Sequence, residues 1–269
     1  MKLSNALSRH NRILLRELVI TDFKLRYQGS VLGYAWSLLK PLFLFLILYV
    51  VFDYFLRLGR DIEHFPVYLL IGVVLWGFFT ETTVNGLQSI VDRGDLIRKI
   101  NFPKYIIVIS GTISSLINLA INMLVVFVFV FINGVDISFQ ALWAIPLVFE
   151  LYIFSLAIAF LLATLNVKLR DIGYLWEIFL QAAFYATPIL YPLAMVIEQS
   201  ELAARVIMLN PVAQIIQDVR HVLVTPESVR LYDIVHDWRI AIPFIVIIVT
   251  SIFALVLFRR NSKYFAEQI

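Results

Sequence analysis

The sequence of 269 residues contains no cysteine and few charged side chains. Without cysteine the chain forms no disulfide, thiolate zinc site, iron–sulfur cluster or cysteine nucleophile. Asp, Glu, Lys and Arg make up 15% of the chain and apolar residues 61%, whereas soluble domains have about 25% and about 45–50%. One water-soluble core of this size cannot bury so much apolar surface, because a small protein needs polar cover. The composition therefore predicts a bundle embedded in lipid.

Motifs for covalent chemistry are also missing. The phosphate-binding pattern G-x-x-x-x-G-K-[ST] does not occur: Gly72 and Gly77 have its spacing, but Phe78 and Phe79 stand where Lys and Ser or Thr are required. Neither G-x-S-x-G nor H-E-x-x-H occurs, and the four histidines are scattered. We therefore expect no catalytic residue, no metal site and no ATP-binding loop in this chain.

Six apolar segments are long enough to cross a bilayer, which takes roughly 20 residues of helix. The longest uncharged run, residues 105–135, contains no Asp, Glu, Lys or Arg. None of the segments alternates apolar and polar residues as barrel strands do. The sequence therefore predicts an all-α integral membrane protein, a single domain over residues 1–269. Its six transmembrane helices are expected at about 34–56, 65–91, 104–132, 140–165, 173–192 and 240–258.

Positive charge is unevenly distributed over the predicted loops. Six crossings place both termini on one side, and the loops of that side hold fifteen Lys and Arg against six on the other. Because the excess of Lys and Arg lies in the cytoplasm, both termini are expected there. The first 30 residues lack a continuous apolar stretch, so no cleavable signal peptide is expected. The loop bias also explains the net charge of +3, which leaves no reason to expect nucleic-acid binding.

Residues 5–27 predict a basic amphipathic helix. At 100° per residue four leucines share one face, and Arg9, Arg12 and Arg16 cluster on the opposite face. Such a helix lies in the membrane interface with its apolar face towards the lipid. It either anchors the chain only, or it also docks a cytoplasmic partner.

Two further segments outside the spans carry helical patterns. In the charged loop 92–104, Gly94 and Pro103 bracket residues that form either a plain turn or one short helix parallel to the membrane. The external segment 193–239 is longer than a connection needs and too apolar for disorder. We expect it to form short helices, at about 202–209 and 212–224, on the outer mouth of the bundle.

Polar residues inside a membrane usually face protein or water. On the predicted third span they follow helical spacing together with a glycine, which favours close helix packing bridged by amides. On the fifth span, Glu177, Gln181 and Phe184 share one face, which either packs or lines a polar path. On the first span, Phe45, Tyr49 and Phe52 share a face that contacts lipid, packs, or lines a pore. A sugar polymer would stack on such rings. The third-span residues are Gly111, Ser115, Asn118 and Asn122.

Several stretches resemble the permease subunits of ABC-2 type polysaccharide exporters, which include O-antigen, teichoic acid and streptococcal rhamnose-polysaccharide exporters. The resemblance covers essentially the whole chain. The T-P-I-x-Y-P element and the Arg-Asp pair after the fourth span are specific in combination. The stretches are Arg26–Leu42 (RYQGSVLGYAWSLLKPL), Arg93–Lys104 (RGDLIRKINFPK), Lys168–Ile172 (KLRDI), Leu180–Pro192 (LQAAFYATPILYP) and Asn210-Pro211.

The resemblance implies a homodimer of permeases in the bacterial plasma membrane, paired with two separate ATPase subunits that hold ATP and Mg²⁺. It implies six spans, an interface helix, and short external helices after the fifth span. A channel between the two permeases, lined by the first and fifth spans, would carry a lipid-diphosphate-linked glycan outward. The loop between spans two and three would act as a coupling helix against the ATPase, through Asp95, Leu96, Ile97, Arg98 and Lys99.

Two other functions fit the sequence less well. One is an ABC-2 permease for a drug or small lipid, and the other is a lipid-sugar scramblase that works without ATP. The interface-helix pattern and the T-P-I-x-Y-P element argue against the first. An ATPase encoded in the adjacent reading frame, or ATP-dependent export, would argue against the second.

Overall fold

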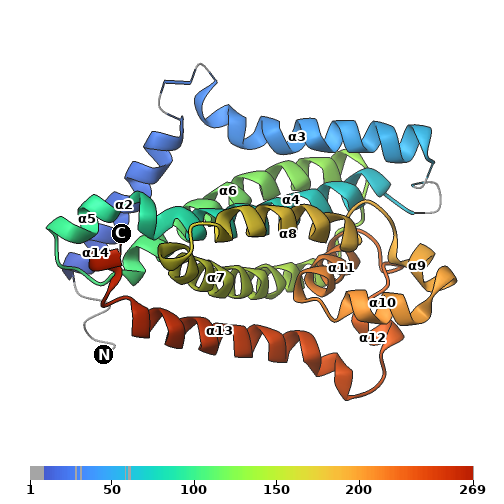
Figure 1. Cartoon of the computed structure of the whole chain (residues 1–269). Helices are drawn as coiled ribbons and strands as arrows, with labels where there is room; N and C mark the ends of the chain where they lie inside the picture. The colour runs from blue at the N-terminus through green and yellow to red at the C-terminus, as the bar shows by residue number, and fades with distance from the viewer. Residues whose placement is uncertain (1–8, 28, 31, 58, 60–61, 269) are drawn as a thin grey trace.

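The computed structural model describes residues 9–268 except 28, 31, 58, 60 and 61, and this part of the chain contains helices and no strand. Figure 1 shows the long helices side by side, with α2, α5 and α14 gathered at one end and α9 to α12 at the other. The α-helices are α2 (Arg9–Tyr27), α3 (Trp36–Tyr49), α4 (Phe65–Asp92), α5 (Gly94–Lys99), α6 (Tyr105–Ile132), α7 (Ala144–Lys168), α8 (Ile172–Ala186), α9 (Leu193–Gln199), α10 (Glu201–Met208), α11 (Pro211–Leu223), α12 (Leu231–Ile234), α13 (Ile242–Asn261) and α14 (Phe265–Gln268).

Five helical segments of the described chain are long and apolar enough to span a membrane. They correspond to the predicted spans one to four and six. Short 3₁₀ turns extend α7 and α13 at their starts, and a π-helical stretch, Val50–Phe55, continues α3. The five segments are Trp36–Phe55, Phe65–Asp92, Tyr105–Ile132, Phe139–Lys168 and Trp238–Asn261.

The predicted fifth span, 173–192, differs from the structure. Helix α8 ends at Ala186, and Thr187 is extended, with φ −91° and ψ 137°. The cause is Pro188, because a proline disfavours helical backbone in the residue before it. The 15 residues of α8 rise only about 22 Å, less than the roughly 30 Å hydrocarbon core. Even so, α8 runs along the bundle from the end with α5 to the end with α9 (Figure 1).

Helix α4 forms the centre of the bundle and is buried over most of its length. Asn85 Nδ2 donates to Ser115 Oγ at 2.8 Å, and Asn118 Nδ2 donates to Glu81 Oε1 at 2.8 Å. The polar stripe predicted on the third span therefore holds α6 against α4. Towards α7 the backbones are close, since a Cβ at Gly86 would lie 2.3 Å from the Ala159 Cβ.

Arg220 of α11 joins the outer helices to this centre. Its side chain is fully buried. The guanidinium donates to the carbonyl oxygens of Tyr68 at 2.9 Å, Pro188 at 2.5 Å and Ile189 at 2.8 Å. It also lies 3.6 Å from the centroid of the Tyr68 ring, a distance suited to a cation–π interaction. One side chain thus ties α11 to α4 and to the turn after α8.

Helices form where the sequence predicts them before the first span and after α8, over the described residues. Helix α2 covers most of the predicted segment, residues 5–8 lie outside the described part, and Arg9, Arg12 and Arg16 are exposed. Helices α10 and α11 coincide with the two predicted external helices, and α9 and α12 add two short turns beside them.

The contact between Gly72 and Arg220 gives a test of this packing. A Cβ at Gly72 would lie 2.4 Å from Arg220 Nη2, whereas a Cβ at Gly77 meets no heavy atom within 4 Å. We expect Gly72→Ala to lower the free energy of unfolding by about 1–3 kcal/mol, the usual cost of overpacking a filled site. Gly77→Ala on the same helix is the matched control and should be neutral or slightly stabilising. Equal thermal unfolding midpoints in detergent for both variants would contradict the packing.

Candidate functional site

A groove of about 1370 Å³ runs between α3 and α8, with α4 and α6 along its floor. Helix α3 contributes Trp36, Lys40 and Leu44, which follow one another at i, i+4 and i+8 on one face. Helix α8 forms the other wall. The floor is mixed: apolar side chains of α4 alternate with its Glu81 and with Asn122 of α6. The groove therefore combines rings, amides, carboxylates and cations.

The predicted face of the fifth span lies in this groove. Glu177, Gln181 and Phe184 all line it. The ring of Phe184 contacts Trp76 of α4, with centroids 6.0 Å apart and an interplanar angle of 61°. Glu177 and Gln181 are exposed to the groove rather than packed between helices. In this one copy of the chain, all three side chains therefore lie along the wall of the groove.

The predicted aromatic face of the first span lies elsewhere. Phe45 is 1% exposed and packs edge-on against Phe129 of α6, with centroids 5.3 Å apart. Tyr49 stacks on Phe45 at 5.8 Å, and Phe52 packs against the same core. None of these three rings lines the groove, which α3 meets with the Trp36–Lys40–Leu44 face instead. The three residues of the Trp36–Lys40–Leu44 face also follow helical spacing, but only Trp36 is aromatic.

The groove has an uneven distribution of charge along its length. Lys40 lies one turn into α3 and Arg170 just before α8, and both helices begin at the end of the bundle that carries α5 (Figure 1). Each cation has an aromatic groove residue four positions away, Trp36 and Tyr174. The carboxylate of Glu177 lies about two turns beyond Arg170 on the α8 wall. In the described part of the chain neither cation forms an ion pair.

The charged loop after α4 folds into the short helix α5. Ile97 is buried in an apolar cluster with side chains of α4, α6, α13 and α14, and Leu96 is half-buried. Asp95, Arg98 and Lys99 are exposed, with Arg98 Nη2 3.4 Å from Asp95 Oδ1. One isoleucine thus anchors the helix while its charged face points away from the bundle. Of the two interpretations, a plain turn and a short helix, the structure has the helix.

Cysteine labelling tests the assignment of the groove. Because the chain has no cysteine, single cysteines can be placed at Gln181, Phe184 and Phe45 without background. A water-soluble maleimide should modify the first two, which line the groove, and leave position 45 unmodified because its side chain is buried against α6. Labelling at 45 as fast as at 181 would show that the aromatic face of α3 is open to water.

The profile of ABC-2 type transporters matches residues 14–224. An "O-antigen export system permease protein RfbA" of Klebsiella pneumoniae is 30% identical over 253 residues, which cover 93% of this chain and 93% of that protein. A protein of the same name from Myxococcus xanthus is 31% identical over 206 residues, 76% of this chain and 77% of its own. This multi-pass, helical chain therefore belongs to the ABC-2 type transporter family, among relatives that are O-antigen export permeases.

Proposed function

We propose that this chain is the permease subunit of an ATP-driven exporter that moves a lipid-linked polysaccharide outward across the bacterial plasma membrane. The observation that carries the proposal is the groove between α3 and α8, in a chain that matches O-antigen export permeases over 93% of its length. A drug or simple lipid needs an apolar pocket. A glycan needs rings and hydrogen-bonding groups along a path, and this groove provides both.

The groove chemistry suits a chain of sugars. The C–H faces of pyranose rings stack on aromatic rings, such as Phe184 and Tyr174. Gln181, Glu177 and Asn122 supply acceptors and donors for hydroxyl groups. Because each contact is weak and repeated, the polymer can slide from one to the next.

The groove is open along one side, and we propose that a second copy of the chain closes it. In such a homodimer, α3 and α8 of each copy would enclose the channel. Helix α8, with the turn that follows it, would cross the membrane in addition to the five longer segments, which gives six crossings. Both termini then lie in the cytoplasm, in agreement with the excess of Lys and Arg at that end. Two ATPase subunits, which hold ATP and Mg²⁺, would bind the cytoplasmic face.

We further propose that Lys40 and Arg170 hold the phosphates of the lipid carrier at the cytoplasmic mouth of the groove. The acidic middle of the groove then excludes the phosphates while neutral sugars pass. We expect Lys40→Gln combined with Arg170→Gln to export at roughly a tenth of the wild-type rate or less, because a charge-assisted hydrogen bond contributes about 1.5–3 kcal/mol. Lys168→Gln is the control: this exposed cation, the last residue of α7 and two positions before Arg170, does not line the groove. If the double variant exports as fast as the control, Lys40 and Arg170 do not bind the phosphates during export.

Reconstitution tests the function itself. The purified chain alone should hydrolyse no ATP, and with its ATPase subunit in proteoliposomes it should move the lipid-linked glycan only when ATP is supplied. Glycan movement without any ATPase would favour a scramblase. Transport of a drug or short lipid with no effect of the glycan would favour the small-molecule permease.

Charge reversal on α5 tests the coupling surface. Arg98→Glu with Lys99→Glu should release the ATPase from the complex, because the new carboxylates meet a surface that has accommodated positive charge. The bundle itself should keep its thermal unfolding midpoint, since both side chains are exposed. Co-purification of the ATPase in wild-type amounts would exclude these two residues from the interface.

A further inference from the structure

Arg93 occupies the junction between the longest buried helix and the proposed coupling helix. It is the one residue between the end of α4 at Asp92 and the start of α5 at Gly94. Its backbone, at φ −112° and ψ 27°, belongs to neither helix. A change in the direction of α5 relative to α4 therefore has to pass through this residue.

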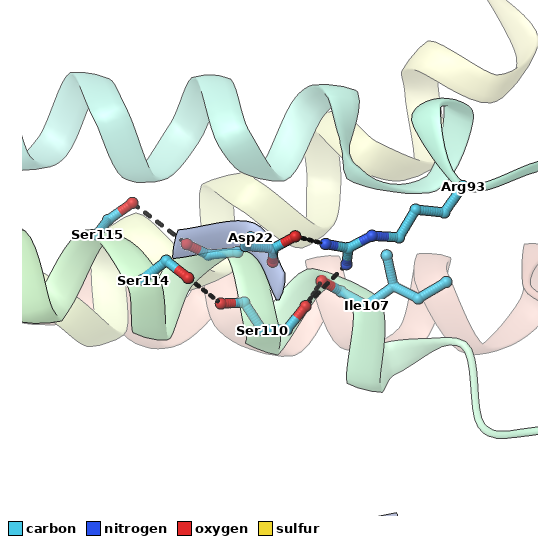
Figure 2. A network of polar contacts seen from close by, with 7 residues as sticks. Asp22, Arg93, Ile107, Ser110, Ser114 and Ser115 are labelled. Atoms are coloured by element: carbon cyan, nitrogen blue, oxygen red, sulfur yellow. Dashed lines mark hydrogen bonds and ion pairs between the residues drawn. The ribbon is translucent and has the colours of Figure 1, made fainter. Parts of the chain in front are cut away.

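The Arg93 side chain joins two further elements (Figure 2). Nη2 donates to Oδ1 of Asp22 on α2, and Nη1 donates to Ser110 Oγ on α6 at 2.9 Å. Ser110 is fixed in turn, since its hydroxyl donates to the Ile107 carbonyl at 2.8 Å. The guanidinium thus connects the interface helix, the coupling helix and a membrane span through adjacent nitrogen atoms.

This ion pair is shielded, in contrast to the other pair at the same end of the bundle. The side chains of Arg93 and Asp22 are 20% and 19% exposed, whereas those of Arg98 and Asp95 are 54% and 87% exposed. Solvent and salt screen the exposed pair far more strongly. Burial lowers the pKa of the Arg93 guanidinium, but an arginine remains charged at physiological pH. Loss of Asp22 would leave a half-buried cation without its counter-charge.

The Asp22 carboxylate has a second oxygen that could accept a hydrogen bond from Arg93. Oδ2 of Asp22 is buried and has no hydrogen-bond partner. If α5 shifts, Arg93 Nη1 can leave Ser110 and donate to this second oxygen, which gives a two-bond pair with the carboxylate. The connection to α2 therefore survives a movement that breaks the connection to α6.

We infer that the Asp22–Arg93 pair is the joint through which movement of the coupling helix α5 reaches the interface helix α2. Movement of α5 by an attached ATPase would pull α2 along. In the chain, residues 28–35 connect α2 to α3, which forms one wall of the groove. Asp22 and Arg93 are positioning residues: they contact neither the groove nor the exposed face of α5. The inference that this movement drives export rests on the proposed function, whereas the mechanical joint can be measured without it.

A distance measurement on the purified chain tests the joint directly. Spin labels on cysteines at Lys24 of α2 and at Ile100 after α5, both exposed, should give one narrow distance distribution in the wild type. We expect the distribution to broaden in Arg93→Gln and in Asp22→Asn. The control is Glu201→Gln, which breaks an exposed ion pair with Arg205 at the other end of the bundle. A narrow, unchanged distribution in both variants would overturn the joint.

Transport by the reconstituted complex tests what the joint does. We expect the two single variants to retain the ATPase subunit and its ATP hydrolysis, but to export roughly fivefold less glycan per ATP or worse, the low end of ordinary coupling effects. The charge swap Asp22→Arg with Arg93→Asp should recover export, and Arg93→Lys should recover part of it. Normal export by the single variants would overturn the coupling role. If the distance distribution broadens in the variants but the wild-type complex moves no glycan, the joint is supported and the proposed function is contradicted.

Discussion

A polar group in the interior of a membrane protein has no water to bind, so it must find its partner within the protein. In this chain that constraint is met mainly around α4. Arg220 satisfies three carbonyl oxygens near the start of α4, Asn85 and Glu81 bridge to α6 further along, and Arg93 follows directly after the last residue of α4. Each of these bonds also fixes a neighbouring element. These bonds thereby hold α6, α11 and the turn after α8 against α4.

The parts that move a substrate would then be those that α4 holds least. Helices α3 and α8 lie against α4 and leave a groove between them, and Lys40, Glu177 and Gln181 in its walls are exposed. Helix α5 is held by Ile97 and by the Arg93 junction. The fully buried side chains are most numerous in α4, α6 and α11.

Much of this could be predicted from the sequence, because apolar runs of span length, amphipathic periodicity and proline or glycine boundaries are local signals. These signals predicted five of the spans, the helix α2, the short helix α5 and the two helices α10 and α11. The spacing of Glu177, Gln181 and Phe184 predicted that they share one helical face, and all three side chains line the groove. Periodicity does not, however, give the direction in which a face points. The rings of Phe45 and Tyr49 share a face as predicted, but it turns towards α6.

Contacts between distant segments could not be predicted from spacing. Arg220 meets Tyr68 across 152 positions, and Arg93 meets Asp22 across 71. In the sequence nothing distinguishes these two arginines from the arginines that commonly flank membrane spans. Their roles depend on burial, which appears only when the helices are assembled. The shorter α8 had a local cause in Pro188, but its apolar run continues past that proline and conceals the helix end.

The claim that the groove carries the glycan is tested most directly by site-specific photo-cross-linking in actively exporting cells. A photoreactive residue at Gln181 faces the groove, whereas one at Ile178, on the same helix and 64% exposed, lies outside the groove lining. The account predicts that position 181 captures the lipid-linked glycan, that capture requires the ATPase subunit, and that position 178 captures mainly phospholipid. Equal capture of glycan at both positions, or none at 181 during export, would contradict it.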